Sequence, residues 1–303
     1  MNWFLLAFIS AVFSAASAVS EKKALFSLDA FNFSFLISII TLLFSIPFFI
    51  NVNYENIFSV SMQLLFLKTI LNAAAFLFVM LSIKNLEISE ALPLLALTPG
   101  LVAISGVFII NDTLTILEWF GIFLMLAGTY VLEAHPNSSQ REGQFKLLRN
   151  FFQPFTVFFK FSKYSYVILA LILFTATSLL DRLLLRDYNL PPYTFMAFQQ
   201  LFYASIFTVV ILVKNRSIFL PVKEVTKRTF YLILVISVFT VIYRYTQIEA
   251  TKLAPVALVL SVKRLSVLMA IIFGGKLFKE DNLLRRVIAA LIILTGTAIL
   301  LNQ

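Results

Sequence analysis

The sequence contains no cysteine and a single histidine, and these two absences exclude several kinds of chemistry. Without cysteine the chain forms no disulfide, holds no Cys-ligated metal or iron–sulfur cluster and offers no thiol nucleophile. The one histidine, His135, lies in a polar stretch between apolar segments, which excludes His-based metal clusters and Ser-His-Asp triads within the apolar part of the chain. The GxxxxGK[ST] motif is absent too. We therefore expect neither a cofactor nor an enzymatic activity.

Charged residues are also few, at 13% of the chain against roughly 25% in soluble domains. In their place 60% of the 303 residues are apolar, which at roughly 20 residues per span is enough for about nine membrane-spanning helices. The net charge is +9, but the basic residues fall in short connections between apolar runs, where they set orientation against anionic lipid. The composition predicts a multi-pass protein of the cell membrane, whose partners are lipids and a small-molecule substrate and not nucleic acid.

Ten apolar segments can be marked, each long enough to cross a membrane as a helix and without the alternation of a β-barrel strand. They span residues 3–20, 31–50, 63–83, 88–110, 116–133, 165–186, 193–213, 229–250, 255–274 and 283–301. The first segment is interpreted as a retained helix and not as a cleaved signal, because its basic residues Lys22 and Lys23 follow the apolar run. The predicted fold is all-α and integral to the membrane, with ten transmembrane helices.

The longest polar connection divides the ten segments into two groups of five. Residues 1–133 form the first unit, residues 134–164 the linker and residues 165–303 the second unit. Part of the linker, residues 149–160, mixes aromatic and basic side chains. This pattern is typical of a segment that lies on the membrane surface, although a flexible linker with an apolar patch explains it almost as well.

The two units match each other in order. Phe13-Ser14-Ala15-Ala16-Ser17 aligns with Phe174-Thr175-Ala176-Thr177-Ser178, and Leu126-Ala127-Gly128-Thr129 aligns with Leu294-Thr295-Gly296-Thr297. Asp112 aligns with Glu280 at a similar offset. Such agreement indicates a duplication. Because five helices is an odd number, the second unit enters the membrane in the opposite orientation, which gives the inverted repeats typical of secondary transporters.

Three stretches give the sequence a family resemblance: Leu253-Ala254-Pro255, the segment Phe273-Gly274-Gly275-Lys276-Leu277-Phe278-Lys279-Glu280, and the final segment with Gly296. With Ala91-Leu92-Pro93 and Gly128 as looser counterparts in the first half, the chain resembles the EamA-type carriers of the drug/metabolite transporter superfamily. Asp112 departs from the glutamate more common there. The resemblance implies that helices one to four and six to nine surround a cavity while helices five and ten pack together. It leaves the substrate open, because members carry amino acids, other metabolites, drugs and sugar conjugates.

Ionisable side chains within apolar segments need an explanation, because each costs roughly 2.5 to 3.5 kcal/mol at the centre of a membrane helix. Four sites stand out in the second half, at estimated depths of about 9 to 15 Å. They are Asp181, the pair Gln199 and Gln200, Arg244, and the pair Lys263 and Arg264. Tyr243 and Tyr245 flank Arg244, while Ser17, Asn72 and Thr98 offer hydrogen bonds from the first half. We predict that these residues, Asp181 excepted, form one substrate pocket.

Two interpretations of the buried charges stay open. Asp181 and Arg244 could neutralise each other as a structural pair, or Asp181 could carry a coupling proton, with Glu90 as a second candidate. For Lys263 and Arg264 the functional interpretation is favoured, since adjacent cations about 100° apart on a helix are not both satisfied by one carboxylate. An excess of buried positive charge indicates a carboxylate or phosphate on the substrate.

Small residues and prolines have simpler interpretations. Gly121 with Gly128, and Ala289 with Gly296, lie seven residues apart on one helix face, which predicts close helix packing. Pro99 with Gly100 could form either a gating hinge or a passive kink.

The leading functional hypothesis is a secondary transporter for a small polar or anionic metabolite such as an amino acid or organic acid, and proton coupling stays open. An exchanger of phosphorylated sugars or nucleotide sugars is the alternative, and a non-transport scaffold or sensor is a further one, although it would predict large extramembrane domains. Basic residues number 17 in the odd-numbered connections and 4 on the opposite side, which predicts both termini outside the cytoplasm. Whether the protein is a monomer or a homodimer stays open.

Overall fold

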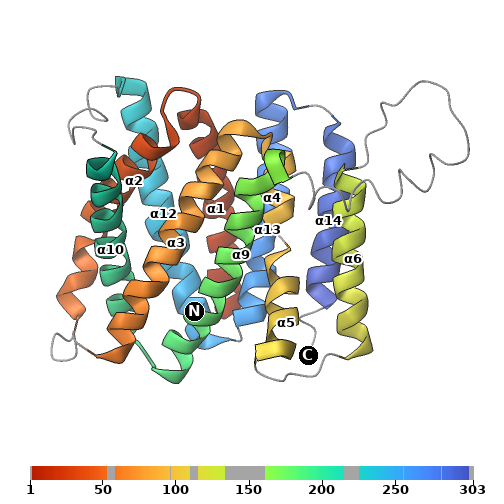
Figure 1. The fold of residues 1–303 in the computed structure, drawn as a ribbon, viewed down its shortest axis with the longest axis horizontal. Coiled ribbons are helices and arrows are strands. Elements are labelled where there is room, and N and C mark those ends of the chain that lie inside the picture. The colour runs from red at the N-terminus through yellow and green to blue at the C-terminus, as the bar shows by residue number, and fades with distance from the viewer. Residues whose placement is uncertain are drawn as a thin grey trace, which may run out of the picture.

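The computed structural model describes residues 2–52, 59–95, 97–109, 115–133, 161–214, 225–254, 256–280 and 282–299. Within these ranges the regular structure is entirely helical (Figure 1). The predicted all-α class is therefore confirmed. His135, Asp112, Pro255 and the linker up to residue 160 lie outside the described residues.

The helices follow the apolar segments of the sequence closely. The first half contains α1 (Trp3–Leu25), α2 (Ala30–Ser45) with the 3₁₀ turn η1 (Ile46–Asn51), α3 (Val60–Asn85), α4 (Ile88–Leu95), α5 (Thr98–Ile109) and α6 (Ile116–Glu133). The second half contains α9 (Phe161–Arg182) with the π-helical turn η3 (Leu183–Asp187), α10 (Pro192–Val213), α12 (Lys227–Leu253), α13 (Val256–Phe278) and α14 (Leu283–Ile299).

The segment predicted as one helix over residues 88–110 is two helices instead. α4 ends at Leu95 and α5 begins at Thr98, whose hydroxyl donates to the carbonyl oxygen of Leu95 at 2.6 Å. Pro99 is the second residue of α5, a position where its missing N–H costs no intrahelical hydrogen bond. Proline thus begins a new helix here, and the polar Thr98 is placed at the junction.

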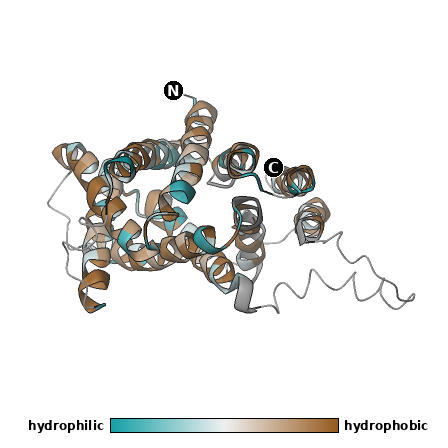
Figure 2. Cartoon of the chain, turned by 90° about the horizontal axis from the view of Figure 1, so that it is seen from above, coloured by the Kyte–Doolittle hydropathy of each residue, from teal (hydrophilic) through white to brown (hydrophobic). Residues whose placement is uncertain are grey.

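Six of the described helical segments are long and apolar enough to cross a membrane. They are Trp3–Leu25, Ala30–Ile50, Val60–Asn85, Tyr164–Leu185, Pro192–Val213 and Lys227–Leu253. Large apolar side chains also face outward, including Ile116 at 90% and Leu43 at 58% exposure, as expected of surfaces covered by lipid. Apolar colour dominates the bundle when it is viewed from above (Figure 2). The finer prediction of ten spans stays a prediction.

The main contacts join helices of the two halves. α1 packs against α12 and α13, α3 packs against α9, and α2 packs against α10. α6 and α14 pack along each other and stand together at one edge of the bundle (Figures 1 and 2). The expected pairing of the last helix of each half is confirmed by this contact.

Small residues bring α6 and α14 together. A Cβ atom added to Gly296 would lie 2.5 Å from the carbonyl oxygen of Gly121, and one added to Gly128 would lie 2.6 Å from Cγ1 of Ile293. Neither glycine has room for a side chain. The predicted close packing at these positions is confirmed, because only the absence of Cβ lets the two backbones approach.

Candidate functional site

A cavity of about 200 Å³ lies between the halves and is lined by α1, α3, α4, α5, α9, α12 and α13. Its lining contains five charged residues: Glu21, Asp181, Arg244, Lys263 and Arg264. Of the predicted pocket residues it also includes Ser17, Asn72, Thr98 and Tyr243. Residues that are far apart in the sequence are thus brought to one site, as the pocket prediction requires.

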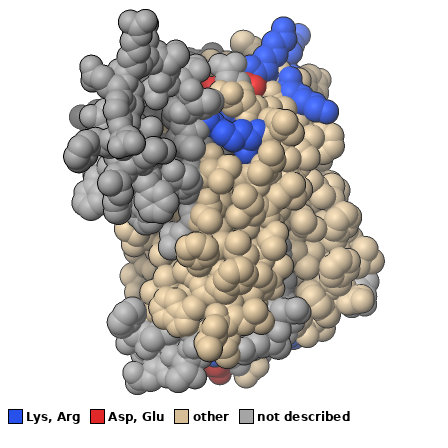
Figure 3. Space-filling model, turned by 90° about the vertical axis from the view of Figure 1, so that its right-hand side faces the viewer, with Lys and Arg blue, Asp and Glu red and all other residues tan. Residues whose placement is uncertain are grey.

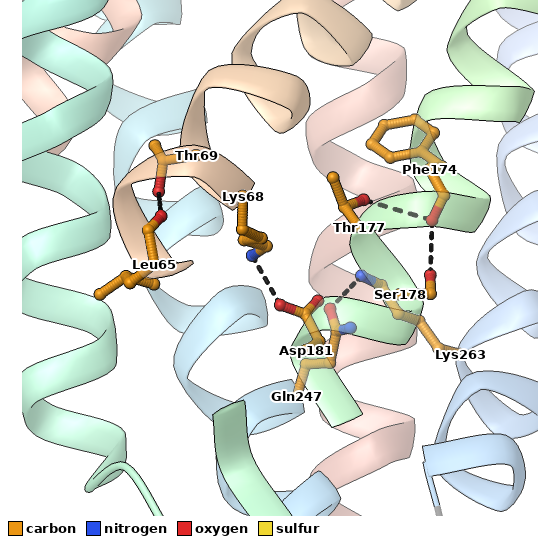
Figure 4. Close-up of polar contacts among 9 residues, drawn as sticks. All are labelled: Leu65, Lys68, Thr69, Phe174, Thr177, Ser178, Asp181, Gln247 and Lys263. Carbon is orange, nitrogen blue, oxygen red and sulfur yellow. Dashed lines mark hydrogen bonds and ion pairs between the residues drawn. The ribbon is translucent and has the colours of Figure 1, made fainter. Parts of the chain in front are cut away.

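Three cations occupy the wall formed by α12 and α13. Lys263 donates a hydrogen bond through Nζ to Oε1 of Gln247 (Figure 4). Nζ of Lys263 also lies 5.0 Å from the ring centroid of Tyr243. Arg244 lies on the preceding helix, with Cζ 5.7 Å from the same ring. The Nε atom of Arg264 is buried and has no hydrogen-bond partner among the described residues. Because both Arg244 and Lys263 lie over the ring of Tyr243, this tyrosine contributes to the wall a ring face, a surface that attracts cations.

No described carboxylate forms an ion pair with Arg244, Lys263 or Arg264. The three basic side chains nevertheless share one small cavity within the helix bundle. Burying unpaired cations is costly, and the cost falls when an anion enters the same space. The arrangement of these basic side chains therefore favours a negatively charged group in the cavity over a positively charged one.

Asp181 pairs with Lys68, and not with Arg244 as one interpretation of the sequence proposed. Oδ1 of Asp181 lies 2.7 Å from Nζ of Lys68 (Figure 4). Nζ of Lys68 also lies 4.7 Å from the ring centroid of Phe195. Lys68 is only 1% exposed, so its side chain lies inside the helix bundle. α3 begins at Val60, which puts Lys68 about 12 Å along the helix. The pair connects α3 of the first half to α9 of the second.

Glu21 adds a negative charge that the sequence analysis did not single out. It is 7% exposed, lines the cavity from α1, and its Oε1 accepts a hydrogen bond of 2.8 Å from the hydroxyl of Ser17. The spacing of Ser14, Ser17 and Glu21 on one helical face was the available signal. It was hidden because Glu21 precedes Lys22 and Lys23, so the three charges resembled the end of a membrane span.

Gln199 and Gln200 line two smaller spaces beside the main cavity. Gln199 shares one of about 30 Å³ with Lys68, Asp181 and Arg244, and neither its Oε1 nor its Nε2 has a partner among the described residues. Gln200 lines another space of about 30 Å³, which also contacts Arg244. Arg244 therefore borders all three spaces. The two amides adjoin the main cavity and are not part of its lining.

The remaining predicted residues divide into two groups. Tyr245 belongs to an aromatic cluster, with its ring centroid 5.0 Å from that of Phe48 and 5.7 Å from that of Tyr193, and not to the cavity lining. The side chain of Glu90 lies outside the described part of the structure. Gln247, which the sequence analysis also missed, lines the cavity and holds Lys263.

A larger cavity lies elsewhere and has a different character. It measures about 670 Å³ and is formed by α2, α10 and the start of α12. Its lining is almost entirely apolar, with Lys227 as the single charged residue among those that border it. Recognition of a polar solute needs convergent polar groups, which the smaller charged cavity has and this one does not.

Comparison with known proteins agrees with this architecture. The model of the EamA-like transporter family matches residues 1–133 and 161–302, nearly the whole chain. The chain belongs to the EamA-like transporter family. The predicted resemblance is thus confirmed, and this EamA-like transporter is a multi-pass membrane protein whose family membership indicates transport rather than catalysis.

Other comparisons of the EamA-like transporter concern its fold. Chains of solved structures match it in 28 cases. One of them, a crystal structure described only as that of a protein, is 14% identical with a TM-score of 0.62, and the match covers 98% of this chain and 95% of the other. At this identity the likeness supports the fold alone. No curated protein matches the sequence.

Proposed function

We propose that this EamA-like transporter moves a small polar or anionic organic metabolite across the membrane as a secondary transporter. The observation that carries the proposal is the wall of three cations, Arg244, Lys263 and Arg264, without a described carboxylate partner. Charge-assisted hydrogen bonds from Lys and Arg to carboxylate or phosphate are about twice as strong as neutral ones. An anionic group on the solute would therefore complete this wall.

The size of the cavity favours a compact solute over the alternative of nucleotide sugars. About 200 Å³ corresponds to the liquid volume of roughly seven water molecules at about 30 Å³ each. A nucleotide joined to a sugar is larger than this space. An amino acid or a short organic acid matches it better.

Alternating access between two inverted repeats is the proposed mechanism, and the pattern of helix contacts supports it. If α1 corresponds to α9 and α3 to α12, the contact of α1 with α12 has its counterpart in the contact of α9 with α3. In the same way, the contact of α1 with α13 corresponds to those of α9 with α4 and α5. α1 and α9 also run in opposite directions in Figure 1. A two-fold relation between inverted halves accounts for these equivalences.

Proton coupling through Asp181, with Glu90 as a second candidate, is the proposed source of energy. The sequence has no P-loop, so accumulation would draw on an ion gradient or on exchange. Protonation of Asp181 would remove the charge that holds Lys68 and so release a link between the halves. We expect Asp181→Asn to lose proton-dependent transport and retain substrate exchange; transport with an unchanged pH profile would instead make Asp181 structural.

The test of the function is the affinity of Arg264 variants for ligands found by thermal-shift screening of amino acids, organic acids, sugar phosphates and nucleotide sugars. Arg264→Ala should lower the affinity for an anionic ligand about 10- to 150-fold, because it removes one charged hydrogen bond worth roughly 1.5 to 3 kcal/mol. Arg264→Lys should restore only part of this, because a bidentate donor becomes a point charge.

The matched control is Arg228→Ala, which removes an exposed cation near the start of α12 and should leave affinity unchanged. Lower melting temperature with intact affinity in Arg264→Ala would make Arg264 a structural residue. Equal loss of affinity in both variants would indicate a general charge effect and would contradict a specific anion site.

A further inference from the structure

The cavity has a negative pole opposite its cationic wall. Glu21 lies on α1, which packs against both α12 and α13, the helices that carry Arg244, Lys263 and Arg264. Glu21 and the three cations line the same space of about 200 Å³. Acidic and basic side chains therefore face one solute-sized volume.

Glu21 is not neutralised by a direct ion pair with any described cation. Its neighbour Lys22 donates through Nζ to the carbonyl oxygens of Ile83 and Leu86 at the end of α3. Arg244 is near enough to interact with Glu21 electrostatically without contacting it. The one described hydrogen bond of the Glu21 side chain comes from Ser17, and it occupies Oε1.

The other acidic residue of the lining is already engaged. Asp181 lies on α9 and is paired at 2.7 Å with Lys68. Asn72, also in the lining, has a buried Nδ2 without a partner among the described residues, but an amide carries no charge. Glu21 is thus the carboxylate of the described lining that is left for a cationic group of the solute.

A solute with negative charge alone would be attracted by the cationic wall and repelled by Glu21. A solute that carries both charges can pair with the cationic wall and with Glu21 at the same time. An analogue that lacks one of its charged groups leaves the matching buried side chain unpaired, and this cost gives the site its specificity. We propose that Glu21 binds the ammonium group of an amphoteric substrate whose anionic group is held by Lys263 and Arg264, an inference that rests on the proposed function. Glu21 is then the residue that distinguishes amino-bearing acids from other organic acids.

Matched ligand pairs test this directly. Each pair consists of an amino acid and the 2-hydroxy acid with the same side chain: alanine with lactate, aspartate with malate, phenylalanine with phenyllactate. The two members differ by an ammonium against a hydroxyl group, and their affinities for the purified full chain are measured by thermal shift and calorimetry. In the wild-type protein, at least one amino acid should bind about 10- to 150-fold more tightly than its hydroxy acid.

Glu21→Gln should abolish this preference. The variant should bind the amino acid more weakly than the wild-type protein does, and it should bind the hydroxy acid with the same or higher affinity. Glu21→Asp retains the charge and should keep a measurable preference, which covers the case in which the Gln variant does not fold. Asp187→Asn removes an exposed carboxylate from the end of the same bundle and is the control that should change neither affinity.

Three outcomes would overturn the assignment, and they separate it from the proposed function. Equal affinity of both members of every pair in the wild-type protein rejects the role of Glu21 and leaves the anion site standing. If Glu21→Gln lowers the affinity for both members of a pair equally, Glu21 acts by positioning Arg244. Absence of binding by every member rejects the amphoteric substrate and the small anionic substrate together.

Discussion

At the residue scale, the ion pair between Lys68 and Asp181 joins the two halves at a place where water is scarce. Lys68 is 1% exposed and Asp181 is 22% exposed, so the lysine depends on its partner far more than the aspartate does. A buried pair adds little net stability over apolar residues of the same volume, yet removing one partner leaves a buried charge unpaired. The pair therefore restricts which substitutions the two helices tolerate.

We expect Asp181→Asn to lower the free energy of unfolding by up to about 3 to 5 kcal/mol, the range for breaking a buried pair, reduced to the extent that water reaches the exposed part of Asp181. Adding Lys68→Met should recover most of that loss. Thermal unfolding in detergent measures both variants.

The control for this prediction is the exposed pair of Lys84 and Asp29, whose charged atoms are 3.7 Å apart and whose side chains are 35% and 38% exposed. Lys84→Ala should change stability through this pair by no more than about 1 kcal/mol. If Asp181→Asn changed stability as little as Lys84→Ala, the contact with Lys68 would not contribute to the fold.

At the element scale, the association of α6 with α14 depends on glycine. Membrane helices gain little from apolar attraction to one another, because lipid is equally apolar, so close backbone approach supplies much of the contact. The atom nearest to a Cβ added at Gly296 is the backbone oxygen of Gly121, at 2.5 Å, whereas the atom nearest to one added at Gly128 is the Ile293 side chain, at 2.6 Å. Further backbone atoms lie 2.9 Å away in both cases. Backbone atoms cannot move aside without separating the helices.

We predict that Gly296→Ala destabilises the protein more than Gly128→Ala, with both losses in the range of about 1 to 3 kcal/mol that overpacking costs. Gly100→Ala is the matched control, because its added Cβ would meet the flexible Met125 side chain at 3.2 Å and should cost less. Melting temperatures of the three variants give the order. A Gly100 variant that is the least stable of the three would show that backbone contact between α6 and α14 is not the limiting feature.

At the scale of the whole molecule, positive charge is distributed unevenly along the direction of the helices. Figure 3 shows Lys and Arg gathered toward one end of the visible face, above a broad surface without charge. Lys22, Lys84, Lys227 and Lys276 all lie in the first or last turn of helices that meet this end in Figure 1. The positive-inside rule places such an end in the cytoplasm.

Labelling of single cysteines tests orientation and inversion together, since the native chain has no cysteine. Phe26, 68% exposed, follows α1, and Tyr188, 45% exposed, follows the π-helical turn after α9. We expect an impermeant maleimide to label Phe26→Cys only from the cytoplasm and Tyr188→Cys only from outside. Labelling of both from one side would reject inverted halves, whereas exchanged sides would reject the orientation and leave the inversion intact.

The sequence by itself determined the all-α membrane class, the family and most helix positions, the break between α4 and α5 excepted. It also indicated the contact between the last helix of the first half and the last helix of the second. Apolar run length, small-residue spacing and shared stretches are local properties, and a bilayer forces each long apolar run to satisfy its backbone as a helix. The same local reasoning identified Lys263, Arg264 and Arg244, because a charge within an apolar run is conspicuous whatever its partner.

Only the tertiary structure decided which of these charges meet. Lys68 and Asp181 are 113 positions apart, and nothing in the sequence near either residue distinguishes Lys68 from Arg244 as the partner of Asp181. Glu21 resembled the end of a span until the packing of α1 against α12 and α13 placed it in the cavity. Electrostatic pairing depends on distances of a few ångströms and on burial, and both are set by how helices pack rather than by the order of residues along the chain.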